Sequence, residues 1–348
     1  MKLAIAGAIC AIAASAAPVA ATPLSALDLM RGFNNIVLGN LQTNVETEGT
    51  LFVGGNYTGN GATVNPRNLP DVDLGGGVSG ALVVGGALSA ANVNLNNGSA
   101  HIGGSVSTNF NNNGGRDIAI GGAFAGNLNL NGGAATIAGA RSGNINLNGG
   151  SVTQAPVAPV PFAEVAATLL ALSSELSMLD ATGGIASLSD NNNVSFQSVA
   201  GPDGIAVFNL DFDTNASIFG VAGTFNGVNA APGVTTIVNV AGKNVSWRLN
   251  GNQNFPGVLF NFFEAEELSI QASFNVSILA PKATVRLSGG GINGTLVSGN
   301  LFQDAEVRPL TFQGDLPPVS QVPLPASAFL LLGGLGLLGG LRARRRAA

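Results

Sequence analysis

The sequence predicts a mostly β protein in which short strands stack as the coils of a solenoid, with one long α-helix packed alongside. A motif ending in glycine recurs at a step of 18 residues, with Gly85, Gly103, Gly121 and Gly139 at equivalent positions. Asparagine-rich strands and glycine turns fall between these glycines. A fixed period near 20 residues is typical of a solenoid, because each coil covers the apolar face of the last, whereas a propeller blade needs about 40 residues.

The first 21 residues have the pattern of an export signal. Lys2 opens a short basic region, an apolar run follows to Ala17, and small residues precede Thr22. A buried N-terminal helix is the alternative, but nothing caps this segment or gives it an amphipathic pattern. The only cysteine, Cys10, lies inside the signal. We therefore expect a mature chain without disulfides or a cysteine nucleophile.

Residues 22–155 are predicted to form the first part of the solenoid. Side chains alternate between the two faces of a strand, so the apolar residues of each Asn-rich phrase point inward and the asparagines outward. The predicted inward residues are Phe110, Leu128, Leu130, Ile145 and Leu147. Stacking aligns the outward asparagines in rows, which comprise Asn92, Asn94, Asn96, Asn127, Asn129, Asn131, Asn144, Asn146 and Asn148. The sequence therefore predicts a flat face covered with amides.

A connector and a helix are predicted for residues 156–183. The connector is rich in proline, and the segment after it repeats apolar residues at three- and four-residue steps, as an amphipathic helix does. The apolar stripe comprises Phe162, Val165, Ala166, Leu169, Leu172, Leu176 and Leu179. Thr182-Gly183-Gly184 is predicted to end the helix. A linker between two domains is the alternative, but the stripe needs a partner, so we expect the helix to pack along one solenoid.

Strand signals return in residues 184–314 and predict the second part of the solenoid. Examples are IAVFNLDFD at 205–213 and FNVSILAPKATVRL at 274–287, which are rich in β-branched and aromatic residues. Residues 315–321, which contain two prolines and few apolar residues, are predicted to be a linker.

The C-terminal segment 322–348 combines a proline motif, an apolar stretch from Ala326 to Leu341 and an arginine cluster. This order resembles the PEP-CTERM class of bacterial sorting signals, in its Val-Pro-Leu-Pro-Ala variant. The residues that carry the resemblance are Val322, Pro323, Leu324, Pro325, Ala326, Arg342, Arg344, Arg345 and Arg346. The resemblance implies an exosortase as partner, transient insertion of the C-terminal helix in the inner membrane, and release or attachment at the cell surface. A plain membrane anchor is the alternative, although the stretch is short beside the roughly 20 residues of a spanning helix.

The body of the chain resembles the choice-of-anchor A family, secreted bacterial proteins whose common domain is joined to varying surface anchors. The resemblance covers most of Phe33 to Phe312, and the motifs follow one another in the same order as in the family. Its specific motifs include FNFFEA at 260–265 and ILAP followed by NGTL. It implies a right-handed parallel β-helix with a long helix beside it, and an adhesive, ice-binding-like role. Where the family usually has Gly-Asp-Leu, this chain has Gly39-Asn40-Leu41. The aspartate is replaced by asparagine, which weakens any functional role for a carboxylate at this position.

Few residues suit catalysis. His101 is the only histidine, and one histidine without a mature cysteine makes neither a Ser-His-Asp triad nor a multi-histidine metal site. Paired acids serve polysaccharide-cleaving enzymes or bind Ca²⁺. The pairs here are Asp211 with Asp213, Asp71 with Asp73, and Glu264 with Glu266 and Glu267. We expect solvated surface acids, with Asp211 and Asp213 as the calcium candidates, no catalytic residue and no cofactor.

The body of the chain is acidic. Between Thr22 and Leu341 there are 9 basic and 19 acidic residues, a net charge of −10, which repels nucleic acid and anionic lipid. The chain is therefore expected to be an exported, non-enzymatic adhesive protein that binds polysaccharide or another surface through the amide rows. A β-helix carbohydrate-active enzyme and an ice binder are alternatives, although ice-binding solenoids usually show threonine rows. The asparagines can equally have a structural role without any ligand: they would form ladders that satisfy the backbone hydrogen bonds of turns, or they would simply keep the protein soluble.

Overall fold

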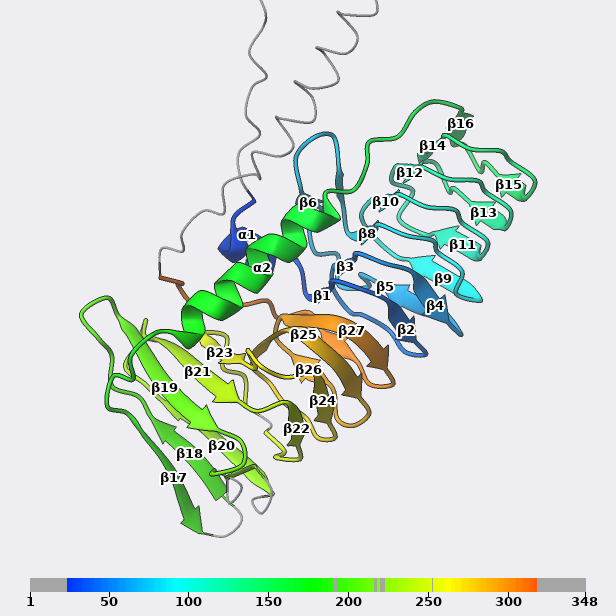
Figure 1. Cartoon of the computed structure of the whole chain (residues 1–348). Helices are drawn as coiled ribbons and strands as arrows, with labels where there is room; N and C mark the ends of the chain where they lie inside the picture. Colours follow the sequence, from blue (N-terminus) through cyan, green and yellow to red (C-terminus); the bar gives the residue numbers. More distant parts are fainter. Residues whose placement is uncertain (1–23, 191–192, 216–217, 220–222, 252, 318–348) are drawn as a thin grey trace, which may run out of the picture.

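The computed structural model describes residues 24–317, apart from 191–192, 216–217, 220–222 and 252 (Figure 1). These residues are mostly β, with two α-helices and long sheets of parallel strands. The predicted export signal at 1–21 and the predicted sorting segment at 322–348, with its apolar helix, lie outside the described residues.

The N-terminal half forms stacked coils that alternate between two parallel sheets. Its strands in the long sheet are β1 (Asn35–Val37), β3 (Leu51–Val53), β8 (Leu82–Val84), β10 (Ala100–Ile102), β12 (Ile118–Ile120), β14 (Ala134–Ile137) and β16 (Ser151–Thr153). The five-stranded sheet comprises β5 (Ala62–Val64), β9 (Asn92–Leu95), β11 (Asn109–Asn112), β13 (Asn127–Asn129) and β15 (Asn144–Asn146). Each strand pairs in parallel with its equivalent in the next coil, which agrees with a β-solenoid.

The last two coils of the N-terminal half are shorter than the predicted repeat. Strands β8, β10 and β12 pair at steps of 18 residues, whereas β12 pairs with β14, and β14 with β16, at a step of 17. As a result, the amide of Gly139 donates to the carbonyl of Gly122 at 3.1 Å. The prediction that Gly139 stacks on Gly121 is therefore wrong by one residue.

The C-terminal half adds longer strands to the same sheet. These are β19 (Ile205–Asp211), β21 (Thr235–Ala241), β23 (Val258–Asn261), β25 (Ser277–Leu287) and β27 (Leu296–Gln303). Two shorter strands of this half, β22 (Asn244–Trp247) and β24 (Glu267–Ile270), and two of the N-terminal half, β2 (Leu41–Thr43) and β4 (Tyr57–Gly59), pair beside the ends of β25 and β27 or with one another. Most strand signals of the C-terminal half therefore correspond to parallel strands of one sheet.

The two halves meet through β1 and β27. These strands pair in parallel, and the long sheet runs in the order β16-β14-β12-β10-β8-β3-β1-β27-β25-β23-β21-β19. The chain therefore starts at the middle of the stack and runs outward to β16. It then crosses to the other end through α2 (Phe162–Ser177) and returns to the middle (Figure 1).

Three small sheets complete the strand list. A three-stranded sheet of β17 (Ile185–Asp190), β18 (Asn193–Gln197) and β20 (Thr224–Asn229) lies beside β19 (Figure 1). Its β17 and β18 are antiparallel, a hairpin that the sequence did not predict. The others pair β6 (Val72–Asp73) with β7 (Ser79–Gly80), and β26 (Ile292–Asn293) with β28 (Val307–Arg308).

Helix α2 lies along the outer side of the long sheet, as predicted (Figure 1). Its buried apolar residues pack in one cluster with α1 (Ala26–Gly32) and with outward side chains of the sheet. Those residues are Val165, Leu169, Leu172 and Leu176. The prediction is wrong at both ends of the helix. Phe162 is 52% exposed, and the helix ends at Ser177, with Met178 as C-cap, before the expected Thr182-Gly183-Gly184.

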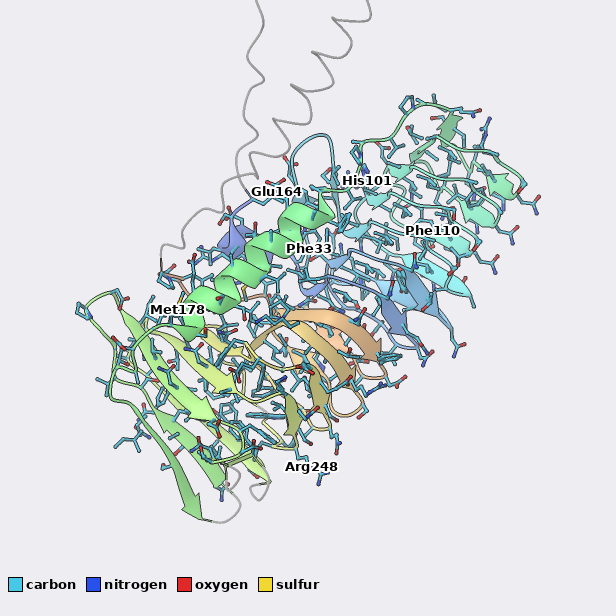
Figure 2. The ribbon with its side chains drawn as sticks, in the orientation of Figure 1. Phe33, His101, Phe110, Glu164, Met178 and Arg248 are labelled. Atoms are coloured by element: carbon cyan, nitrogen blue, oxygen red, sulfur yellow. The ribbon has the colours of Figure 1, made fainter. Side chains whose placement is uncertain are left out.

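The interior of the coils is mostly apolar. Phe110, which Figure 2 labels, Leu128 and Leu130 are fully or almost fully buried, as predicted. Leu147, in contrast, is 45% exposed, and Ile145 is only partly buried. The prediction for Leu147 is wrong because the two sheets of the N-terminal half end at β15 and β16, so that the described chain supplies no further coil to cover it.

Aromatic side chains fill the wider C-terminal half. Trp247 stacks on Phe274 with ring centroids 3.7 Å apart and meets Phe260 edge to face at 5.3 Å. All three side chains are fully buried. Each large ring buries far more apolar surface than a leucine, so this cluster is a major source of stability for the half that carries it.

Candidate binding faces

Three rows of asparagine side chains cover the outer side of β9, β11, β13 and β15, and we call this surface the amide face. In the middle row the Nδ2 of Asn111 donates to the Oδ1 of Asn94 at 2.8 Å. Asn129 donates to Asn111 at 2.6 Å, and Asn146 donates to Asn129 at 2.7 Å. The strand register places these four residues directly above one another, so the predicted alignment is confirmed.

The two flanking rows repeat this pattern in part, since the Nδ2 of Asn131 donates to the Asn112 carbonyl at 3.2 Å and not to a side chain of its row. The bonds run from Asn127 to Asn109 at 2.6 Å, from Asn144 to Asn127 at 3.1 Å, from Asn113 to Asn96 at 2.8 Å and from Asn148 to Asn131 at 2.9 Å. Asn92 lies at the start of its row and accepts a 3.3 Å bond from Asn111. All nine predicted asparagines are exposed or half-buried. The face is thus a grid of linked amides rather than a set of independent side chains.

Asn131 and Asn148 differ from the other members of the grid. Their φ angles are 49° and 45°, in the left-handed region, and they follow the ends of β13 and β15. Asparagine tolerates this conformation better than most residues, and the glycine after it completes the turn. These two residues are therefore turn positions, although they were predicted to continue the strand alternation.

A second amide row lies beneath the C-terminal end of α2, where Asn239 and Asn261 are buried and Asn209 is exposed. Asn209, Asn239 and Asn261 stand at one register across β19, β21 and β23. The Nδ2 of Asn261 donates to the Ser173 carbonyl at 2.9 Å and to the Oδ1 of Asn239 at 2.9 Å. Asn239 donates to the Leu176 carbonyl at 2.7 Å. The row therefore binds the C-terminal carbonyls of α2 and fixes the helix on the sheet.

The sequence carried a signal for this second row that was not used. Each of its asparagines stands between apolar residues, in VFNL, IVNV and LFNF, just as in the exposed phrases. The alternation fixes the side of the strand on which the amide lies. It does not say whether a helix covers that side.

Asn40 joins neighbouring coils at a corner. Its side-chain Oδ1 accepts a hydrogen bond from the backbone amide of Asn56 at 2.9 Å, and its backbone amide donates to the Oδ1 of Asn300 at 2.9 Å. Asn56 in turn accepts from the amide of Ala87 at 2.9 Å. These side chains extend the backbone pairing between coils. Gly39-Asn40-Leu41 is therefore a structural corner in this chain.

His101 has a structural position. It lies on β10, is 4% exposed, and its Nε2 is 2.7 Å from the carbonyl oxygen of Ala158 (Figure 2). Ala158 belongs to the proline-rich connector that leads into α2. The imidazole therefore holds the connector against the long sheet.

The predicted calcium pair sits at the end of a strand. Asp211 is the last residue of β19, and Asp213 lies in the turn that follows. The backbone amide of Thr214 donates to Asp211 at 2.8 Å and lowers the pKa of that carboxyl. The two acids were grouped because residues two apart on one strand share a face. Since only Asp211 belongs to the strand, that reason does not hold here.

The other predicted acids contact separate partners. Asp71 accepts from the amide of Ser99 at 3.0 Å, and Asp73 from the amide of Gly75 at 2.8 Å. Glu264 accepts from the backbone amide of Gly242 at 3.2 Å. Glu266 pairs with Lys243 at 2.8 Å, and Glu267 lies 3.8 Å from Arg286. Their positions in turns and surface ion pairs agree with the expectation of solvated acids.

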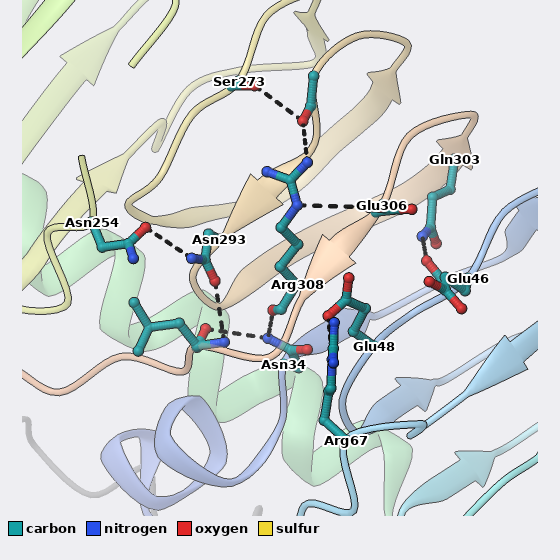
Figure 3. Close-up of polar contacts among 12 residues, drawn as sticks. Asn34, Glu46, Glu48, Arg67, Asn254, Ser273, Asn293, Gln303, Glu306 and Arg308 are labelled. Atoms are coloured by element: carbon teal, nitrogen blue, oxygen red, sulfur yellow. Dashed lines mark hydrogen bonds and ion pairs between the residues drawn. The ribbon is translucent and has the colours of Figure 1, made fainter. Parts of the chain in front are cut away.

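A cluster of three acids was missed. One carboxylate oxygen of each of Glu46, Glu48 and Glu306 lies within 4.8 Å of the others, the only such group of three among the described residues (Figure 3). Glu48 pairs with Arg67 at 2.9 Å, and Glu306 with Arg308 at 3.6 Å. Burial, followed by the charges of Glu306 and Glu48, raises the pKa of Glu46. Because two arginines compensate part of the charge, we assign this cluster as an ion-pair network.

Comparisons with known proteins identify the domain and the tail. A family model described as "Putative Ice-binding-like adhesive domain" matches residues 26–309, and one described as "PEP-CTERM protein-sorting motif" matches residues 321–346. No match was found among curated proteins or among solved structures. Within the described residues, no helix is long and apolar enough to cross a membrane. The sorting motif implies export to the cell surface and processing by an exosortase-type system. Since the first match covers most of the chain, the protein belongs to the ice-binding-like adhesive family and carries a PEP-CTERM sorting motif at its C-terminal end.

Proposed function

We propose that this protein is a secreted bacterial surface or matrix adhesin without catalytic activity, and that its amide face binds extracellular polysaccharide. The observation that carries the proposal is the hydrogen-bonded grid of asparagines on β9, β11, β13 and β15. The family and the sorting motif support a place at the cell surface for such a face.

The grid leaves hydrogen-bonding capacity for a ligand. A primary amide has two N–H donors and an oxygen with two lone pairs. Asn129, for example, uses one donor and one acceptor of its amide on Asn111 and Asn146. Its second N–H and its second lone pair therefore remain for sugar hydroxyls. Because the ladder already fixes the side chains, binding loses less conformational entropy than it would with free asparagines.

Catalysis has weaker support than binding. A glycosidase needs two carboxyl groups facing one bond across a fixed separation. The predicted acids contact separate amides and bases, and Asp211 already accepts a hydrogen bond from its own turn. The alternative of a carbohydrate-active enzyme is therefore not favoured. For the winding of the coils we propose the right-handed sense, which the family resemblance implies and which parallel crossovers favour.

The test is attachment of cells that display the protein to an array of glycans and matrix proteins. The row variant carries Asn94→Ser, Asn129→Ser and Asn146→Ser. The control carries Asn60→Ser, Gln154→Ser and Gln313→Ser, three exposed amides outside the amide face. One hydrogen bond contributes only about 0.5–1.5 kcal/mol net, so a single substitution should be nearly silent and the triple variant should lose attachment to polysaccharide.

Salt separates this mechanism from a charge-based one. Neutral amides are not screened, so attachment should be similar at low and high ionic strength. If the folded row variant attaches as well as wild type and the control, the asparagines are scaffold only. Release of shortened or unsaturated glycan products would instead support the enzyme.

A further inference from the structure

A second polar groove lies away from the amide face, on the outer side of β2, β4, β24, β25 and β27. It has a volume of about 380 Å³. The strand register places six outward side chains in one line across the coils: Thr58, Gln42, Phe302, Arg286, Ser269 and Ser246. Buried Leu41 and Leu301 form the floor. We propose that this groove is a binding site for a linear, neutral polysaccharide, with the Arg286 guanidinium and the Phe302 ring beneath it as the stacking platform, and the N–H groups of Arg286 as hydroxyl donors.

Phe302 and Arg286 form the centre of the groove. The ring of Phe302 is half-buried, and the Cζ of Arg286 lies 4.4 Å from its centroid. The nearest carboxylate, on Glu267, is 3.8 Å from the Nε of Arg286, which is longer than a hydrogen bond. The guanidinium side chain is 55% exposed. Its planar fork of N–H groups is therefore held in position over the ring and remains available to a ligand.

The groove suits an uncharged ligand with alternating apolar and hydroxyl surfaces. Arg286 and Glu267 cancel in charge, and the remaining polar residues of the lining are amides and hydroxyls such as Gln42 and Thr284. A pyranose ring has an apolar face that stacks on an aromatic side chain and hydroxyls at its edge. Those hydroxyls match the donors of Arg286 and the acceptors of Glu267. The net charge of −10 on the chain body disfavours a polyanion.

The line of the groove continues over the N-terminal half. Backbone pairing places Ser89, Ser107, Ala125 and Ser142 after Thr58 in the same direction. These small side chains leave the surface smooth. Adjacent strands are about 4.8 Å apart, close to the length of one sugar unit, so a chain running along the stack meets one coil per unit. A polymer is thus a better fit to this surface than a single sugar.

Isothermal titration calorimetry tests the site. The full chain, purified in mild detergent, is titrated with cellohexaose, xylohexaose and mannohexaose, and with a galacturonic acid hexamer as the anionic comparison. A neutral hexaose should bind. Phe302→Ala should weaken binding by about three- to tenfold, the range given by one lost stacking contact. Arg286→Lys should also weaken it, because lysine keeps the charge but loses the fork.

Two controls make the result specific. Phe162→Ala removes another half-exposed phenylalanine, on α2, and should leave the affinity unchanged. The Phe302→Ala change made in the row variant, whose amide face is disabled, should weaken hexaose binding by the same factor as in wild type, so this proposal and the function of the amide face fail independently. If Phe302→Ala does not fold, Phe302→Leu keeps the apolar bulk and Arg286→Lys still gives the answer.

Three results would overturn the proposal. The first is no binding of any neutral hexaose. The second is binding of the galacturonic acid hexamer alone. The third is equal affinity in the Phe302 and Phe162 variants.

Discussion

The same substitution in the two amide rows should have very different costs. Asn261→Ala removes three hydrogen bonds beneath α2, those from its Nδ2 to Ser173 O and Asn239 Oδ1 and that from Ser173 Oγ to its Oδ1. At about 0.5–1.5 kcal/mol each, the free energy of unfolding should fall by about 1.5–4.5 kcal/mol. Asn129→Ala removes two bonds on the exposed grid, where water replaces them, so its cost should stay near 0.5 kcal/mol.

Urea unfolding measures both values. The buried Trp247 gives a fluorescence signal from the aromatic core of the C-terminal half, and far-ultraviolet circular dichroism follows the whole stack. Hydrogen exchange provides a second measurement, because α2 amides should lose protection in the Asn261 variant and keep it in the Asn129 variant. The reasoning fails if the two substitutions cost the same, or if Asn261→Ala costs less than about 0.5 kcal/mol.

Three further predictions concern the core, the acidic cluster and the tail. Leu130→Ala should lower the free energy of unfolding, measured in urea, by about 2–5 kcal/mol. Leu147 lies one coil further on and is 45% exposed, so Leu147→Ala should lower it clearly less. Equal losses would contradict the conclusion that no described coil covers Leu147. Burial and neighbouring acids raise the pKa of Glu46 above its ordinary 4.5, so its protonated form adds stability below that pH, and this stability is lost as the pH rises through the raised pKa. Glu46→Gln should therefore be more stable than wild type at neutral pH and should flatten the stability profile just above pH 4.5; an unchanged profile would be evidence against it. Replacing Pro323 and Pro325 with alanine should retain the protein in the inner membrane in a cell-fractionation assay, and unchanged surface display would argue for a plain anchor.

Local periodicity predicted the repeating parts of the fold well. Alternation with period two placed Leu128 inside and Asn129 outside, because a strand has only two sides. The three- and four-residue spacing located α2, although its stripe did not show that Phe162 lies beyond the covered surface. The same alternation also misassigned Leu147. It gives the direction of a side chain and contains no information on whether another coil follows.

Features that depend on distant pairing were not predictable from local patterns. Glu306 meets Glu46 and Glu48 because β27, just before it in the sequence, returns to the middle of the stack and pairs with β1. Nothing near Glu306 in the sequence signals this meeting. The groove around Phe302 has the same origin, since Gln42 of the N-terminal half becomes a neighbour of Phe302 only when the two halves join.

The joining of the halves also determines how the molecule would stand on a cell. The Nη2 of Arg31, near the end of α1, donates to Gly314 O and Asp315 Oδ1, both at 2.9 Å. The described chain therefore begins and ends together, at the middle of the rod and on its helix-covered side (Figure 1). An attachment made through the residues after 317 would hold the stack of coils at its middle, with its long axis across the point of attachment. Both tips would stay free, and the helices would face the cell, with the amide face and the groove of Phe302 turned toward whatever the cell meets.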